Sequence, residues 1–432
     1  MRKKHSFIGM LLVTALTLTA VGCSSNNAGD QGSSGGGDQG KVVLQYYTWT
    51  DEENYMRKVV DAFNAKNPDI EVKMNTISNN SDEYNTKIMN NLSGGSKMDV
   101  YSINGTSSLG LYASRNQLVD LSDPIKQANL DVGAYGPSFQ DITQVLTQGK
   151  YYALPYRTSE YALFYNKAIF EKEGIEPPKQ MTWNEYADLA KSLTKGDGSS
   201  KQWGGYYADW ITAPLGALQQ GTTLLDDNLD KVGDWLKFQD RLYEQDKSHM
   251  SYKQMKAESI DWIKQFESGN VAMMVNGEWT ISMLKADIAA GKTDIDFDMA
   301  PLPQPDGVKD PVTVGGVSTF MGINPASGNQ DAAFKFVQFV TGQEGESIIA
   351  DSGVLPAFSS DKTKDSFLNG TGIQGSGFFF EAKAVAENQP VGQIEEVNRV
   401  YGEQRDLFLF HEQDADKTIQ NFMSQRQSVL NK

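Results

Sequence analysis

The chain has 432 residues, of which 39% are hydrophobic and 10% aromatic, and its formal net charge is -16 at pH 7. A negative charge of this size excludes nucleic acid and an anionic membrane surface as the main partner, because both repel an acidic protein. The length exceeds the roughly 250 to 300 residues at which a single core divides. We therefore expect a globular protein with two lobes.

The first 40 residues have the composition of an export signal followed by a tether. Three basic residues precede an apolar stretch at 7–21, and Gly22 then separates this stretch from Cys23. This is the order of parts in a secretory signal, and the apolar run is shorter than the ~20 residues that span a bilayer. We predict a cleaved signal at 1–22. Residues 23–40 are rich in Gly, Ser, Asn and Asp, a composition that predicts a flexible tether.

Cys23 is the only cysteine in the chain. The preceding Ala20-Val21-Gly22 resembles the cleavage box of bacterial lipoproteins, in which the cysteine receives a diacylglycerol anchor and becomes the first mature residue. A buried free cysteine is the alternative, but the polar residues that follow Cys23 disfavour a place in a core. We predict lipidation of Cys23, which would hold the protein on the outer face of the cytoplasmic membrane.

Strand and helix patterns alternate after the tether. In chain order the sequence predicts a strand at 42–47, a helix at 53–67, a strand at 70–74, a helix at 82–93 and a strand at 99–103. This alternation predicts an α/β fold with a parallel sheet. Ligands of such sheets lie beyond the carboxyl ends of the strands, which makes Thr48, Trp49 and Asn104 candidates. Asn104 could instead cap a helix that begins near Ser107.

A second group of elements follows a turn at Gly149-Lys150. The pattern predicts strands at 161–165 and 271–275, and a helix that ends at 266–268. Thr182 and Glu185 have the spacing of a capping box, which predicts a helix start.

In this order the segments resemble the bacterial extracellular solute-binding protein family 1, from about Val42 to the C terminus. The matching segments are 154–156 (LPY), 165–167 (YNK), 174–178 (GIEPP), 182–185 (TWNE), 266–274 (FESGNVAMM) with Trp279, Gly315-Gly316 and 332–336 (AAFKF). Members capture a ligand, most often a carbohydrate, for an ABC importer, and those of Gram-positive bacteria are lipoproteins. The resemblance implies a periplasmic-binding-protein-like fold of type II, with two α/β lobes, crossing hinge strands and a ligand cleft.

We place the N-terminal lobe at 41–156 with 316–351, and the C-terminal lobe at 157–315 with 352–432. The ligand would bind in the cleft between the lobes, where small-molecule sites are common. Sugar rings have an apolar face and a rim of hydroxyls, so aromatic faces and charged or amide groups are the expected contacts.

Trp279 is the first candidate, because it follows a buried strand and matches the position at which the family places a sugar-stacking tryptophan. Packing in the core or between lobes is the alternative. Trp49, at a strand end, and Trp210, after a Tyr-rich stretch, are further candidates with the same alternative. We assign the remaining tryptophans to packing, namely Trp183, Trp203, Trp235 and Trp262.

Arg157 and Glu160 lie where the chain should cross between the lobes, and the family often places a polar or acidic ligand contact there. A salt bridge between these two residues within the hinge is the alternative. Gly316 completes the predicted site, although the pair Gly315-Gly316 favours a role in hinge motion.

The sequence does not match the known motifs for catalytic, metal or cofactor sites. Alternating aspartates at 294–298 begin like a calcium loop, but Met299 replaces the required Gly and Pro305 the bidentate Glu. The order G-x-x-G-x-G at 372–377 is wrong for a dinucleotide loop, and there is no P-loop. We expect no catalytic residue, no metal and no cofactor.

We therefore predict a lipid-anchored, monomeric binding subunit that captures a mono- or oligosaccharide by hinge closure and delivers it to a membrane permease. An anchored glycoside hydrolase is the alternative, and it would need two carboxylates ~5 to 9.5 Å apart in the cleft. A non-sugar ligand, such as a polyamine, an amino acid or a metal chelate, is the third possibility.

Overall fold

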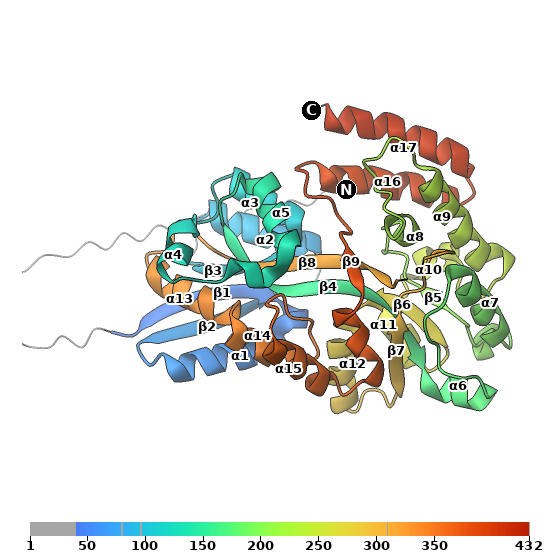
Figure 1. Ribbon diagram of the computed structural model, residues 1–432, viewed down its shortest axis with the longest axis horizontal. Helices are drawn as coiled ribbons and strands as arrows, with labels where there is room; N and C mark the ends of the chain where they lie inside the picture. The colour runs from blue at the N-terminus through green and yellow to red at the C-terminus, as the bar shows by residue number, and fades with distance from the viewer. Residues whose placement is uncertain (1–39, 79–80, 96, 309, 432) are drawn as a thin grey trace, which may run out of the picture. The chain divides into compact units, whose positions relative to one another are not determined.

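Two hydrophobic cores organise the chain. The computed structural model describes residues 40–431 apart from 79, 80, 96 and 309. The strands β4 (Ala153–Asn166) and β8 (Val312–Ile323) contribute side chains to both cores. We call the parts built around these cores the first and second lobes. Two lobes joined by crossing strands were predicted from the sequence, and this architecture is confirmed (Figure 1).

The sheet of the first lobe has the order β2-β1-β3-β8-β4. In it β1 (Val42–Trp49) pairs in parallel with both β2 (Ile70–Ile77) and β3 (Val100–Asn104). By contrast, β8 runs antiparallel to β3 and to β4. The prediction of a parallel sheet is therefore wrong for its crossing part. There, β8 brings the chain back from the second lobe and runs opposite to the strand that left.

Helices cover this sheet with their apolar faces. In α1, Tyr55, Val59 and Phe63 recur every four residues and are buried, and the helix ends before Pro68 as predicted. The helices of the first lobe are α1 (Glu53–Lys66), α2 (Ser81–Ser93), α3 (Thr106–Ser114), α4 (Ser122–Gln127), α5 (Gly136–Thr147), α13 (Gln330–Val340) and α14 (Gln343–Ala350), with the short helical turns η1 (Thr50–Glu52) and η2 (Val132–Tyr135). The burial of these faces holds the strand ends of this lobe in place.

The second lobe has its sheet on the far half of β4. There β4 pairs antiparallel with β6 (Met273–Gly277) and β7 (Phe297–Pro301), and β5 (Tyr206–Tyr207) pairs in parallel with β6. A short strand, β9 (Lys383–Val385), adds to β8. The predicted strand at 271–275 is present as β6, two residues further along the chain.

One helix of the second lobe begins where its capping residues predict. Thr182 and Glu185 form the predicted capping box at the start of α7. In Figure 1 α16 and α17 lie side by side, and with α9 they enclose a small apolar cluster. The helices are α6 (Lys167–Glu173), α7 (Trp183–Leu193), α8 (Leu215–Leu218), α9 (Asp230–Asp240), α10 (Tyr252–Glu258), α11 (Trp262–Glu267), α12 (Trp279–Ala289), α15 (Asp361–Thr371), α16 (Ile394–Leu409) and α17 (Ala415–Leu430), with the turns η3 (Gly198–Ser200), η4 (Arg241–Gln245) and η5 (Gln374–Phe380).

A pair of glycines lies where the strands cross, and one of them lets the strands approach closely. Gly315 and Gly316 of β8 lie opposite Glu160 and Ser159 of β4, with φ values of 155° and 142° that favour glycine. A Cβ atom on Gly315 would lie 2.0 Å from the carbonyl oxygen of Ser159, so only glycine fits there. The hydroxyls of Ser159 and Ser318 form a hydrogen bond of 2.7 Å across the same strands.

The predicted signal at 1–22, Cys23 and the tether at 23–40 lie outside the described residues, apart from Gly40. Lipidation of Cys23 therefore stays a prediction, as do the boundaries at which we divided the lobes. None of the helices in the described part of the chain is long and apolar enough to span a membrane.

Candidate ligand-binding site

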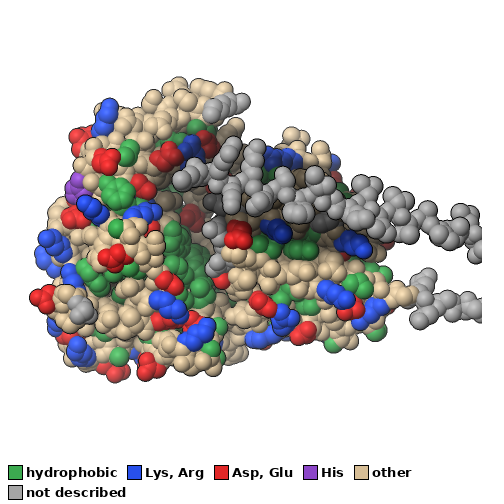
Figure 2. Space-filling model, turned by 180° about the vertical axis from the view of Figure 1, so that it is seen from behind, with side chains coloured by type: hydrophobic (Ala, Val, Ile, Leu, Met, Phe, Trp, Pro, Cys, Tyr) green, Lys and Arg blue, Asp and Glu red, His purple; other side chains and the backbone are tan. Residues whose placement is uncertain are grey.

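A cleft of about 810 Å³ lies between the lobes. Figure 2 shows the domain hollowed near its middle, with hydrophobic side chains gathered beside the hollow. Five of the seven predicted ligand-binding residues line this cleft, namely Trp49, Asn104, Arg157, Trp210 and Trp279. The other two, Glu160 and Gly316, are not among its lining residues. The structure thus brings together residues that are up to 230 positions apart in the sequence.

Three indole rings form the wall of the second lobe. Trp210 lies between Trp279, with ring centroids 5.9 Å apart, and Trp262, at 6.3 Å. Tyr161 meets Trp279 edge to face at 5.9 Å. The result is a continuous aromatic wall with Trp210 exposed, which suits the C–H face of a ring-shaped ligand. Trp262, which we assigned to packing, does pack against the core of the second lobe, and the start of α11 also places this side chain on the cleft.

A glycine in β6 makes room for the Trp279 ring. Trp279 is the first residue of α12, and its indole lies back over Gly277 at the end of β6. A Cβ atom on Gly277 would lie 2.0 Å from the ring, so any larger residue would displace the indole. By contrast, Trp183 and Trp235 pack against each other in the core at 4.8 Å, as predicted.

The wall of the first lobe is more polar. Trp49 is only 8% exposed and packs edge to face against Tyr84 at 5.2 Å, so it offers less surface than the three indoles. Asn104 is exposed at the end of β3. The helix α3 begins at Thr106 with Gly105 as its cap and no side-chain capping bond. The alternative role of Asn104 as a helix cap is therefore wrong, and Asn104 lines the cleft instead.

Arg157 is held by one carboxylate from each lobe. Its Nη1 lies 3.3 Å from Glu52, at the end of η1, and its Nε lies 3.2 Å from Glu278, just before α12. The alternative of an Arg157–Glu160 salt bridge is therefore wrong, because these two carboxylates already surround the guanidinium. Burial opposes the charge of Arg157, but Glu278 and Glu52 outweigh it and raise the pKa of the guanidinium.

Glu52 is fully buried and well supplied with donors. Its carboxylate accepts hydrogen bonds from the hydroxyls of Thr48 at 2.6 Å and Tyr156 at 2.5 Å, in addition to Arg157. Burial raises the pKa of Glu52, and the charge of Arg157 and the hydroxyl donors oppose this shift. A carboxylate with so many internal partners serves to position the hinge.

Two further carboxyls of the hinge have raised pKa values. Burial raises the pKa of Glu278 to about 7 against the opposing charge of Arg157. Burial, and after it the charge of Glu278, raises the pKa of Glu160 to about 8. Glu160 is 6% exposed, and its Oε2 has no hydrogen-bond partner. Glu160 therefore belongs to the hinge rather than to the surface of the cleft.

Sequence reasoning missed a third group, which reaches the cleft from the segment between β9 and α16. Glu387 lines the cleft there, and its carboxylate accepts a hydrogen bond of 3.1 Å from the hydroxyl of Tyr161. Burial raises the pKa of Glu387 to about 7, although the Tyr161 bond lowers it. No motif marks this segment, so only the folded chain reveals it.

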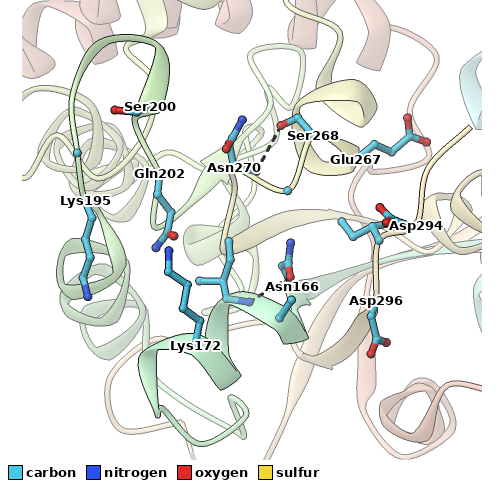
Figure 3. Close-up of a pocket in the computed structure, with 15 residues that line it drawn as sticks. Asn166, Lys172, Lys195, Ser200, Gln202, Glu267, Ser268, Asn270, Asp294 and Asp296 are labelled. Atoms are coloured by element: carbon cyan, nitrogen blue, oxygen red, sulfur yellow. Dashed lines mark hydrogen bonds between the residues drawn. The ribbon is translucent and has the colours of Figure 1, made fainter.

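A separate hollow of about 510 Å³ lies on the second lobe (Figure 3). Charged and amide side chains line it, without an aromatic residue or any of the predicted site residues. Its Lys195 pairs with Glu173, and its Asp296 pairs with Lys167 at 2.9 Å. No group of three or more His, Cys, Asp or Glu side chains among the described residues could hold a metal ion. The aromatic cleft is therefore the better candidate for a ligand site.

Two lobes, crossing strands and an interlobe cleft define a solute-binding protein of the periplasmic type II fold. Residues 48–347 match the sequence model of the bacterial extracellular solute-binding proteins, and the chain belongs to this family. The family consists of solute-binding proteins rather than enzymes.

Relatives of this chain carry names of sugar-binding proteins. A maltotriose-binding protein of Pyrococcus abyssi is 25% identical over 356 residues, which cover 78% of this chain and 71% of the relative. A melibiose/raffinose/stachyose-binding protein of Bacillus subtilis is 23% identical over 84% of this chain and 83% of the relative. Among solved structures, a sugar transporter of Rhizobium etli in an open conformation is similar, with a TM-score of 0.74 and 25% identity over 89% of this chain and 98% of that chain.

Proposed function

We propose that this protein captures a neutral carbohydrate in the interlobe cleft and delivers it unchanged to the permease of an ABC importer. The observation that carries this proposal is the wall of three indoles, Trp210, Trp262 and Trp279, opposite a polar wall. Aromatic faces bind the C–H face of a sugar ring, and amide and carboxylate groups bind its hydroxyls. The names of the relatives above agree with this ligand class.

The ligand is bound by closure of the lobes about the crossing strands. Rigid-body closure about a few hinge residues is the established motion of periplasmic binding proteins. Gly315 and Gly316 supply backbone freedom in β8, while Arg157 ties both lobes to β4. The protein acts as a monomer, held by a lipid on Cys23 at the outer face of the cytoplasmic membrane of a Gram-positive bacterium.

A thermal-shift screen tests the ligand class. A ligand that binds only the folded protein raises the melting temperature. We expect a rise with at least one of maltotriose, melibiose, raffinose and stachyose, and none with polyamines or amino acids. The sugar should also be recovered intact by chromatography after prolonged incubation. A shift with a polyamine alone, or cleavage of the sugar, would contradict the proposal and would favour a non-sugar ligand or a hydrolase.

A further inference from the structure

A smaller hollow of about 190 Å³ adjoins the cleft. Three residues, Glu387, Asn388 and Glu395, line both hollows. On the opposite side, Trp210 lines the cleft and Thr212, two residues later in the same loop, lines the smaller hollow. The same two segments of chain therefore contribute to the lining of both hollows. We call the smaller hollow the side pocket; its further lining residues include Pro214, Leu218, Leu224, Gln389, Ile394 and Asn398.

The side pocket has one apolar wall and one polar wall. Leu218, Leu224 and Ile394 present hydrocarbon, and Leu218 and Ile394 are almost fully buried. On the other wall the amide of Asn398 donates a hydrogen bond of 2.6 Å to the amide oxygen of Asn388, which orients both groups. An amide has two donor hydrogens and an acceptor oxygen, so both side chains keep capacity for a ligand. This pairing of apolar and hydrogen-bonding surface fits a hydroxyl-bearing ring.

The charge of the side pocket points to the same chemistry. Its lining residues include the carboxylates of Glu387 and Glu395 and, in the described part of the chain, no lysine or arginine. Carboxylates accept hydrogen bonds from hydroxyls and repel anions. A volume of about 190 Å³ equals that of about six waters at ~30 Å³ each, which is enough room for one sugar ring.

We propose that the side pocket binds one further sugar residue of a ligand whose other rings lie against the indoles of the cleft. This inference rests on the proposed function and makes the ligand an oligosaccharide rather than a monosaccharide. The loop from Trp210 to Pro214 and the segment from Glu387 to Asn398 then guide the sugar chain from one hollow into the other.

Titration calorimetry with two sugar ladders tests this inference. The ladders are maltose to maltotetraose, and melibiose, raffinose and stachyose. For the native protein we expect the affinity to rise about tenfold at the step of the ladder at which a ring first occupies the side pocket. A tenfold rise corresponds to the free energy of one or two hydrogen bonds with their apolar contacts. Gln389→Trp fills the side pocket from a segment without regular structure and should abolish this rise, while the affinity for the shorter sugars stays unchanged.

Gln393→Trp is the matched control, since Gln393 is exposed in the same segment and lines neither hollow. Should Gln389→Trp fail to fold, Asn398→Leu removes the amide without filling the pocket and should also reduce the rise. If the sugars bind but neither variant changes the dependence on chain length, the side pocket is not a subsite while the proposed function stands. If no sugar of any length binds, the proposed function itself fails and this inference fails with it.

Discussion

The guanidinium of Arg157 lies 3.2 Å from the carboxylate of Glu278, the residue directly before Trp279. The backbone N–H of Glu278 also donates a hydrogen bond of 2.9 Å to the carbonyl oxygen of Glu160. The crossing strand β4 is thus tied to the start of the helix that carries Trp279, one of the aromatic rings that line the cleft. The second carboxylate on Arg157, from Glu52, ties the same strand to the first lobe. Hinge and ligand wall are therefore one connected structure.

Arg157→Met should destabilise the protein strongly. Arg157 is only 13% exposed, and its loss leaves the buried carboxylates of Glu52 and Glu278 without their counter-charge. Breaking a buried pair in this way costs about 3 to 5 kcal/mol. Urea denaturation measures this loss. The double variant Arg157→Met/Glu278→Gln removes one of the two stranded charges and should recover part of the stability. A loss of unfolding free energy below about 1 kcal/mol, as for an exposed ion pair, would contradict the buried ion pairs of Arg157 with Glu52 and Glu278.

Trp279→Ala should weaken sugar binding by about 1 to 3 kcal/mol, because one aromatic face and its buried area are lost. Calorimetry with the sugar found in the thermal-shift screen measures the affinity. Trp203→Ala is the control, since Trp203 packs against the core of the second lobe and does not line the cleft. The control should lower stability and leave affinity unchanged. Equal affinities of Trp279→Ala and the native protein would remove Trp279 from the site.

Stability should fall as the pH rises through the range in which Glu160 titrates. The pKa of Glu160 is about 8 in the folded protein, against about 4.3 in an unfolded chain, so the folded state holds this proton more tightly. The stabilising contribution is complete below about pH 4 and is lost as the pH rises through about 8. The urea midpoint of unfolding should therefore fall with pH between about pH 5 and pH 9. Glu160→Gln should remove the part of this fall that Glu160 causes. Glu278, with a pKa of about 7, should cause a pH dependence of the urea midpoint that remains in Glu160→Gln.

Glu381→Gln is the control for this measurement, because Glu381 is exposed. Its midpoints should follow those of the native protein across the whole range. A slope in Glu160→Gln that equals the native slope would show that Glu160 carries no proton in the folded protein at neutral pH.

An acidic sugar should bind more weakly than its neutral counterpart. Among the residues that the structure describes, Arg157 is the only basic one that lines the cleft, and two carboxylates already neutralise it. The other charged residues that line the cleft are Asp51, Glu52, Glu387 and Glu395. A uronic acid in place of a terminal neutral ring should lose at least about tenfold in affinity, and added salt should narrow the gap. Equal or tighter binding of the acidic sugar would show that Arg157 is available to ligands.

Local sequence patterns predicted the positions of helices and strands well. The relative direction of paired strands could be known only from the whole fold. Strand and helix periodicity located β1, α1 and the capping box of α7 within a few residues. The antiparallel pairing of β8 with β3 and β4 follows from the return of the chain between lobes, which no local pattern carries. The sequence therefore indicated the two lobes, but not the mixed character of the sheet between them.

The residues of the candidate site also divide into those that the sequence could predict and those that it could not. Trp210 and Trp279 could be predicted, because they follow strands near the point where the lobes meet. The place of Trp262 on the cleft was missed, since the first residue of a helix with buried neighbours is typical of packing, which Trp262 also shows. Arg157 was predicted, but its partners Glu52 and Glu278 lie more than 100 positions away in the sequence. Residue spacing in a sequence cannot predict contacts over such separations.

Closure of the two lobes around an intact sugar is the motion on which the proposed function depends. Small-angle X-ray scattering of the protein, with and without a saturating amount of the sugar that gives the largest thermal shift, tests it most directly. We expect a smaller radius of gyration in the presence of the sugar, and a smaller change for Trp279→Ala at the same sugar concentration. An unchanged radius of gyration with a sugar that calorimetry shows to be bound would contradict capture by closure.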